Sequence, residues 1–96
     1  MNRNRIIAAL KYFKEQNQDK YNIIKIGIFG SAVREALGPD SDLDIVVMLK
    51  KQDLFELIGI KQDLEEELNI SVDVISYRTK MNAFLKRRID EEAVYA

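Results

Sequence analysis

The sequence predicts an α/β (α+β) fold in which a small, mixed, three-stranded sheet is covered by about four helices. Segments with apolar residues at helical spacing alternate along the chain with short segments rich in β-branched residues. The link between the first two expected strands is short, so these strands can run antiparallel. The second and third strands are separated by about twenty residues that include a helix, enough for a right-handed parallel crossover.

The length of 96 residues indicates a single domain, residues 1–96, with one modest core. Hydrophobic residues make up 47% and charged residues 32%, which is typical of a globular chain. Lys and Arg number 15 and Asp and Glu 16, and the net charge of −1 argues against broad electrostatic binding to nucleic acid or membrane. No apolar run approaches the ~20 residues of a membrane span and no signal peptide opens the chain, so we expect a cytoplasmic protein.

The chain contains no cysteine and no histidine. Disulfides, zinc fingers, thiol catalysis and Ser-His-Asp triads are therefore excluded. A metal ion would have to be bound by oxygen atoms, which favours Mg²⁺, Mn²⁺ or Ca²⁺. An EF-hand loop that began at Asp40 would need Gly and Glu where Ile45 and Lys51 stand, so a calcium loop of that type is excluded.

The first half of the chain is expected to form a helix, a strand and a second, short helix. Apolar residues recur at helical spacing from Asn2 to about Gln18, where a polar stretch follows. Ile23–Phe29 is rich in β-branched residues and predicts the first strand. Ser31 is a suitable N-cap for a short helix to about Leu37, and Gly38-Pro39-Asp40-Ser41 has the composition of a turn.

The second half is expected to continue the alternation. Asp42–Leu49 predicts the second strand, and its apolar tail indicates a central place in the sheet. Asp53 to Asn69 predicts a helix, with the aspartate as its cap and the asparagine at its end. Ile70–Ser76 predicts the third strand, and Thr79 is the expected cap of the last helix. Ala93–Ala96 is either frayed or a short edge strand.

Polar residues gather where the first expected strand ends and the second begins. Gly30 and Ser31 leave the first strand with unpaired backbone N–H groups and a hydroxyl, and glycine lets the backbone approach a bulky anion closely. Asp42 and Asp44 are two residues apart in a strand, so both carboxylates project from one face. Asp73 in the parallel third strand is expected near enough to join them.

Three convergent carboxylates repel one another, and a divalent cation with oxygen ligands relieves that repulsion. Magnesium is held in proteins by one or two carboxylates together with waters and substrate phosphates. A phosphate cradle beside a carboxylate cluster is therefore typical of metal-assisted phosphoryl or nucleotidyl transfer.

The order and spacing of these residues resemble the signature of a known family. Gly30-Ser31, ten intervening residues and Asp42-Leu43-Asp44 resemble the Gly-Ser-x10-Asp-x-Asp signature of polymerase-β-like nucleotidyltransferases. With its length and its third-strand Asp73, the whole chain is similar to the minimal nucleotidyltransferases (MNT-type proteins), many of which are antitoxins of toxin–antitoxin pairs. The resemblance implies the polymerase-β-like fold.

The resemblance also implies roles for individual residues. Asp42, Asp44 and Asp73 would be the catalytic residues and the ligands of two Mg²⁺ ions, with Mn²⁺ as an alternative. Asp73 would also orient or deprotonate the attacking hydroxyl. The nucleotide phosphates would be contacted by Gly30, Ser31 and Arg34.

The activity implied is the Mg²⁺-dependent transfer of a nucleoside monophosphate, AMP, from an NTP, ATP, to an acceptor hydroxyl. No acceptor-binding domain is evident in the chain, so a partner protein is expected to supply the acceptor. The resemblance implies that this acceptor is a tyrosine of a HEPN-domain toxin. A complex with this toxin or a homo-oligomer is expected, and direct binding to nucleic acid or membrane is not.

Two positions depart from the family pattern and leave a rival interpretation open. Ala32 stands where relatives often carry an arginine, and Glu35 stands where they often carry a glycine. The rival is an antitoxin that occludes its partner without turnover. Transfer to a small molecule such as an aminoglycoside is a third interpretation, disfavoured because the chain offers no second domain to hold that substrate.

Other conspicuous residues have simpler interpretations. Lys86-Arg87-Arg88 lies beside Asp90-Glu91-Glu92 and is interpreted as a solvated helix face rather than a nucleic-acid site. Tyr12, Phe84 and Tyr95 are the aromatic residues expected to be exposed, where they could serve an interface.

Overall fold

The computed structural model describes residues 2–34, 38 and 42–96. The elements follow the order α1 (Arg3–Tyr21), β1 (Ile23–Ile28), a 3₁₀ turn η1 (Gly30–Ala32), β2 (Leu43–Leu49), α2 (Leu54–Leu68), β3 (Val72–Ser76), α3 (Ala83–Glu92) and β4 (Val94–Tyr95). The predicted helix to Leu37 and turn over 38–41 fall mostly on residues outside the described part of the chain. Within that part, no helix combines the length and apolarity that a membrane crossing requires.

The sheet has four strands in the order β3-β2-β1-β4. β1 pairs with β2 and with β4 antiparallel, whereas β2 and β3 are parallel. The mixed α+β class and both predicted strand directions are therefore confirmed. The predicted strand number was too small, because Val94–Tyr95 adds an edge strand to β1.

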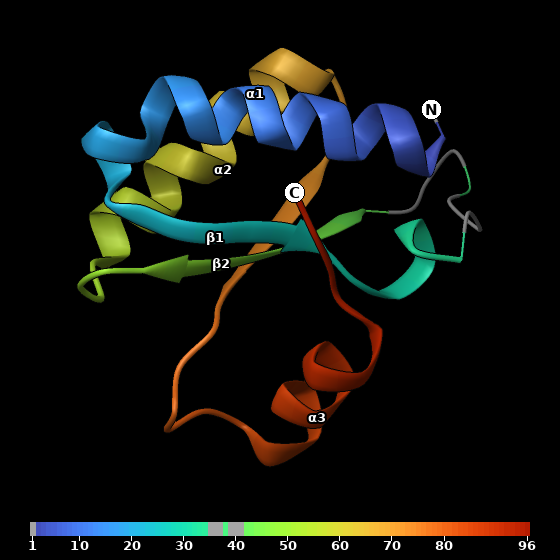
Figure 1. The fold of residues 1–96 in the computed structure, drawn as a ribbon, viewed down its shortest axis with the longest axis vertical. Helices are drawn as coiled ribbons and strands as arrows, with labels where there is room; N and C mark the ends of the chain where they lie inside the picture. The colour runs from blue at the N-terminus through green and yellow to red at the C-terminus, as the bar shows by residue number, and fades with distance from the viewer. Residues whose placement is uncertain (1, 35–37, 39–41) are drawn as a thin grey trace.

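The helices divide the core between the two faces of the sheet. Figure 1 shows α1 and α2 on one face and α3 on the other. The larger core lies under α1 and α2 and includes Leu43, Ile45 and Val47 of β2. A smaller cluster of Phe29, Val46 and Ile89 lies under α3.

The ends of α2 agree with the prediction, and the end of α1 does not. Asp53 caps α2 by accepting from the backbone N–H groups of its first turn, and Asn69 ends the helix in the left-handed conformation with φ 56°. α1 continues past Gln18 to Tyr21, and Asn22 ends it at φ 55°. The polar stretch does not stop the helix because the Tyr21 ring beyond it is buried and stacks on Phe13.

Two predicted caps are wrong. The side chain of Asn82, not Thr79, accepts from the Leu85 N–H at 3.0 Å, so α3 begins later than expected. Ser31 lies inside η1, and Phe29 occupies its N-cap position without a side-chain hydrogen bond. The turn begins two residues earlier than expected because Gly30 adopts φ +70°, which places the chain in the 3₁₀ turn directly after β1.

Candidate active site

The turn after β1 packs directly against β2. The Phe29 N–H donates to the Asp44 carbonyl oxygen at 3.2 Å, which ties the end of β1 to the start of β2. Gly30 has φ +70°, and a Cβ built on it would lie 2.7 Å from Oδ2 of Asp44. A side chain at position 30 would be strained by the left-handed backbone and would force the Asp44 carboxylate to move, so this position favours glycine.

The three predicted aspartates lie at the N-terminal ends of the parallel strands β2 and β3. Asp44 of β2 is paired with Asp73 of β3, and Asp42 directly precedes β2. Asp42 and Asp73 are exposed, whereas Asp44 is half-buried. Burial, followed by repulsion from Asp73, raises the pKa of the Asp44 carboxyl above its ordinary value, and Asp42 adds to this effect.

The donor chemistry of these residues fits a divalent cation. Carboxylate oxygens from two adjacent strands are the ligands that Mg²⁺ prefers, and a bound cation would relieve the repulsion that acts on Asp44. Among the described residues, however, no three acidic side chains already stand close enough to bind one ion together. Metal binding by Asp42, Asp44 and Asp73 therefore stays a prediction.

Two residues of the site come from α3 and were missed at the level of sequence. Glu92 Oε2 accepts from the Gly30 N–H at 3.3 Å, and Glu92 Oε1 lies 3.1 Å from Nη1 of Arg34. Arg88 Nη2 lies 3.7 Å from Glu92 Oε2, and the Arg88 guanidinium counteracts the rise in the Asp44 pKa. The available signal was the spacing of four between an arginine and a glutamate on one helix, which does not indicate what the pair faces.

The remaining predicted site residues differ in their surroundings. Ser31 is half-buried in η1, and Arg34 is exposed with its guanidinium on Glu92. Ala32 is buried with 1% exposure in the larger core, so the side chain of an arginine at this position would have to leave the core to reach the turn. The cation beside Gly30 is supplied instead by Arg88, whose Nη2 would lie 3.5 Å from a Cβ at position 30.

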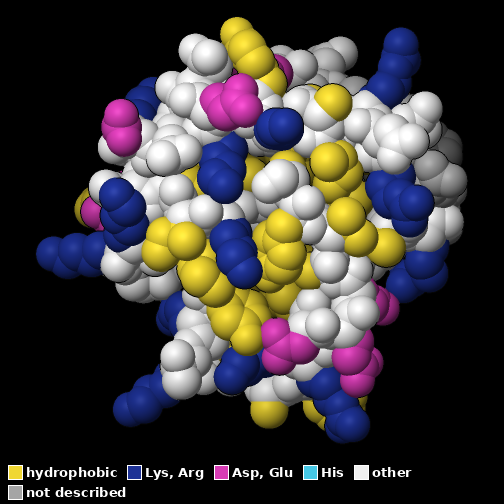
Figure 2. All heavy atoms as spheres, viewed as in Figure 1, with side chains coloured by type: hydrophobic (Ala, Val, Ile, Leu, Met, Phe, Trp, Pro, Cys, Tyr) yellow, Lys and Arg dark blue, Asp and Glu magenta, His cyan; other side chains and the backbone are white. Residues whose placement is uncertain are grey.

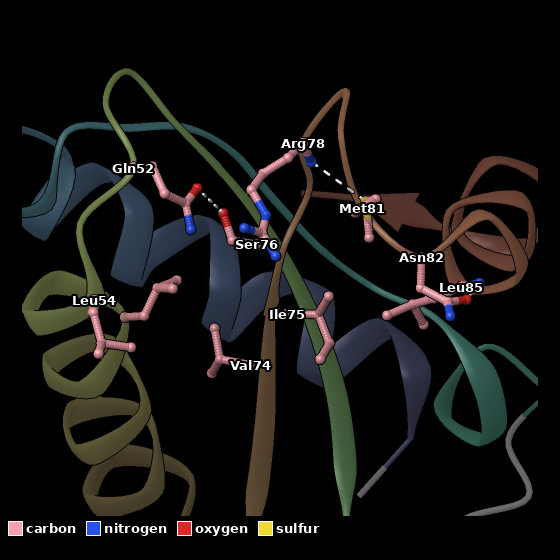
Figure 3. Close-up of a pocket in the computed structure, with 10 residues that line it drawn as sticks. Gln52, Leu54, Val74, Ile75, Ser76, Arg78, Met81, Asn82 and Leu85 are labelled. Carbon is pink, nitrogen blue, oxygen red and sulfur yellow. Dashed lines mark hydrogen bonds between the residues drawn. The ribbon is translucent and has the colours of Figure 1, made fainter.

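A groove of about 480 Å³ follows the outer edge of β3 between the N-terminal parts of α2 and α3. Its lining is largely apolar, and Ser76 Oγ donates to Gln52 Oε1 across it at 2.8 Å (Figure 3). Asp73 precedes the first β3 residue of this lining, Val74. The groove therefore begins beside the acidic residues but does not contain them.

The surface agrees with the near-neutral composition. Figure 2 shows Lys and Arg spread over the face in view, with acidic side chains among them and no continuous basic area. Arg87 is 80% exposed, as expected for a solvated helix face, whereas Arg88 turns to Glu92. The aromatic residues predicted to be exposed are so, with Tyr12 at 58%, Phe84 at 82% and Tyr95 at 38%.

The sequence pattern of one known family matches almost the whole chain. This family is described as polymerase beta, nucleotidyltransferase, and its match runs over residues 10–95. The chain belongs to this nucleotidyltransferase family. The predicted family and enzyme class are thereby confirmed, and the glycine turn and the paired aspartates lie within the matched region.

Individual relatives extend the similarity. The protein adenylyltransferase MntA of Thermococcus cleftensis is 29% identical over 91 residues, which cover 94% of this chain and 91% of that protein. A toxin–antitoxin structure with AMP-PNP has a TM-score of 0.75 at 23% identity, covering 99% of this chain and 72% of its own. The MNT antitoxin complexed with a tri-AMPylated HEPN toxin of Shewanella oneidensis has a TM-score of 0.71 at 18% identity, covering 97% and 70%. These two structures show that the fold is shared.

Proposed function

We propose that this nucleotidyltransferase transfers AMP from ATP to a tyrosine hydroxyl of a HEPN-domain toxin and so acts as its antitoxin. The observation that carries the proposal is the packing of Gly30 against the Asp44 carboxylate, with Asp73 beside it on the next strand. This juxtaposition supports an anion-binding role for the turn and an acceptor-activating role for the carboxylates. The adenylyltransferase name of MntA and the AMPylated HEPN toxin in a structure of the same fold support AMP and a toxin as substrates.

Each residue of the candidate site has its own role in the transfer of AMP. Gly30, Ser31 and Arg34 hold the β- and γ-phosphates, and Asp73 orients the acceptor hydroxyl and takes its proton. The acceptor oxygen then bonds to the α-phosphorus, and the bond from that phosphorus to the bridging oxygen breaks and releases pyrophosphate. Mg²⁺ held by Asp42, Asp44 and Asp73, or Mn²⁺ in its place, would supply positive charge to the phosphate oxygens.

The test is the mass of the cognate HEPN toxin after co-expression with this protein. Wild-type antitoxin is expected to add one or more adenylyl groups to the toxin, located on tyrosine by fragmentation. The variant Asp42→Asn/Asp44→Asn should leave the toxin unmodified and toxic while still folding. Glu67→Gln, an exposed change on α2, is the matched control and should behave as wild type.

Two other results would contradict the proposal. Protection by the double aspartate variant, with an unmodified toxin, would show neutralisation by occlusion. Modification of an aminoglycoside with no change in the toxin would show a small-molecule transferase.

A further inference from the structure

We propose that Gly30, Arg34 and Arg88 form the seat of the nucleotide's terminal phosphates and that Glu92 occupies this seat when nucleotide is absent. The inference rests on the proposed function and adds two residues, Arg88 and Glu92, to its nucleotide site. The carboxylate of Glu92 then acts as an internal competitor that the triphosphate must displace.

The contacts of Glu92 are those that a phosphate would make. Its Oε2 accepts from the Gly30 N–H at 3.3 Å and faces Arg88 Nη2 at 3.7 Å, and its Oε1 lies 3.1 Å from Arg34 Nη1. One backbone donor and two guanidinium groups, which come from two distant segments of the chain, thus converge on one anion. Arginine pairs with carboxylate and with phosphate through the same planar donors, so the seat accepts either group.

Glu92 can leave the seat without disturbing the end of α3. Glu92 is the last residue of α3, and the helix end is held by the Ala93 N–H, which donates to the Ile89 carbonyl oxygen without any help from the Glu92 side chain. The Glu92 side chain is 29% exposed, so it can rotate into solvent. An incoming triphosphate carries more negative charge than one carboxylate and would repel Glu92 while it takes over both arginines.

A neighbouring ion pair shows what an ordinary pair on this helix looks like. Arg87 Nε and Glu91 Oε1 lie 3.4 Å apart with the same spacing of four residues, but these side chains are 80% and 67% exposed. This pair contacts neither the glycine turn nor Arg34 in the described contacts. Arg87 and Glu91 are therefore matched controls for Arg88 and Glu92, with the same residue types on the same helix.

The experiment measures the dissociation constants of inorganic tripolyphosphate and of AMP-PNP by calorimetry, first without and then with Mg²⁺. Glu92→Gln should bind both ligands about fivefold more tightly than wild type. The substitution removes a competing carboxylate, and the ion pairs that this carboxylate makes are partly exposed and therefore weak. Arg88→Gln should bind about fivefold more weakly, whereas Arg87→Gln and Glu91→Gln should stay within about twofold of wild type. The gain from Glu92→Gln should shrink in the Arg34→Gln background, because the two side chains share a contact. Thermal unfolding of each variant verifies that it is folded.

The outcomes separate a failure of the Glu92 competitor role from a failure of the proposed function. Wild-type binding with no gain in Glu92→Gln would overturn the competitor role and leave the proposed function intact. A loss of affinity in Glu92→Gln that appears only with Mg²⁺ would overturn it as well and would place Glu92 among the metal ligands. Absence of binding in folded wild type and in every folded variant would overturn both this inference and the proposed function.

Discussion

Asp44 is held in the folded protein at an electrostatic cost. It is half-buried, and Asp73, Asp42 and Glu92 all repel its charged form, while only Arg88 among the contributing groups favours it. The pKa of Asp44 is raised for this reason, so the carboxyl is more easily ionised in the unfolded chain than in the folded one. The folded state therefore loses stability as the pH rises through the Asp44 titration.

Asp44→Asn should consequently stabilise the protein while it abolishes transfer. We expect the free energy of unfolding at pH 7 to rise by about 0.5–1 kcal/mol, reduced by solvent screening, and Tm to rise by about 2–6 °C. The difference should narrow as the pH falls towards 4, because the raised pKa lets the folded wild type take up a proton on Asp44 more readily than the unfolded chain does. Thermal unfolding at both pH values, with Glu67→Gln as control, measures this. A destabilised Asp44→Asn variant at pH 7 would show that the aspartate is stabilised by contacts that outweigh the repulsion.

The sequence predicted the neighbouring positions of the acidic residues on β2 and β3 and missed the contribution of α3 to the candidate site. The strand period of two and the parallel crossover predicted Asp44 and Asp73 on adjacent strands, and the register of β2 with β3 agrees. Binding of one metal ion by Asp42, Asp44 and Asp73 stays a prediction. Arg88 and Glu92 could not be placed, because a helical i,i+4 pair is as compatible with solvent as with a site. Only the packing of Ile89 under the sheet decides which way the pair faces.

Helix α3 depends on a cap that lies closer to it than the predicted one. Asn82→Ala should lower the free energy of unfolding by about 1 kcal/mol, because the Leu85 N–H would lose its side-chain acceptor. Thr79→Ala should change it by less than about 0.5 kcal/mol. Urea unfolding of both variants measures the difference, and equal losses would contradict the assigned helix start.

Element boundaries were predictable where local chemistry sets them. Asp53 and Asn69 flank α2. The Asp53 side chain accepts from N–H groups of the first turn, and Asn69 ends the helix through its own left-handed backbone. The end of α1 and strand β4 were not predictable in this way. The Tyr21 ring extends α1 by packing on Phe13, and β4 exists because β1 offers it hydrogen bonds.

Strand β4 near the C-terminus pairs with β1 from the first third of the chain, and this pairing closes the edge of the sheet. Gly27 lies opposite Tyr95, and a Cβ at position 27 would lie 2.5 Å from the carbonyl oxygen of Val94. The Ala96 N–H also donates to the Ile26 carbonyl oxygen at 2.8 Å. The missing side chain at position 27 is therefore what allows β4 to approach β1.

Deletion of residues 94–96 and the substitution Gly27→Ala should each lower the free energy of unfolding by about 1–2 kcal/mol, since each removes the same strand pairing. Combined, they should cost little more than either change alone. Urea unfolding of the two single variants and the double variant measures the coupling. Additive losses would mean that Gly27 has a role in the sheet apart from β4.

The contact between Gly30 and Glu92 spans 62 positions of the chain, and this separation has a consequence for biosynthesis. Translation delivers the glycine turn and β2 to the outside of the ribosome well before α3. The glycine turn, Asp42 and Asp44 are therefore synthesised well before Arg88 and Glu92. The phosphate seat that we propose can form only after α3, the last helix of the described chain, has been synthesised.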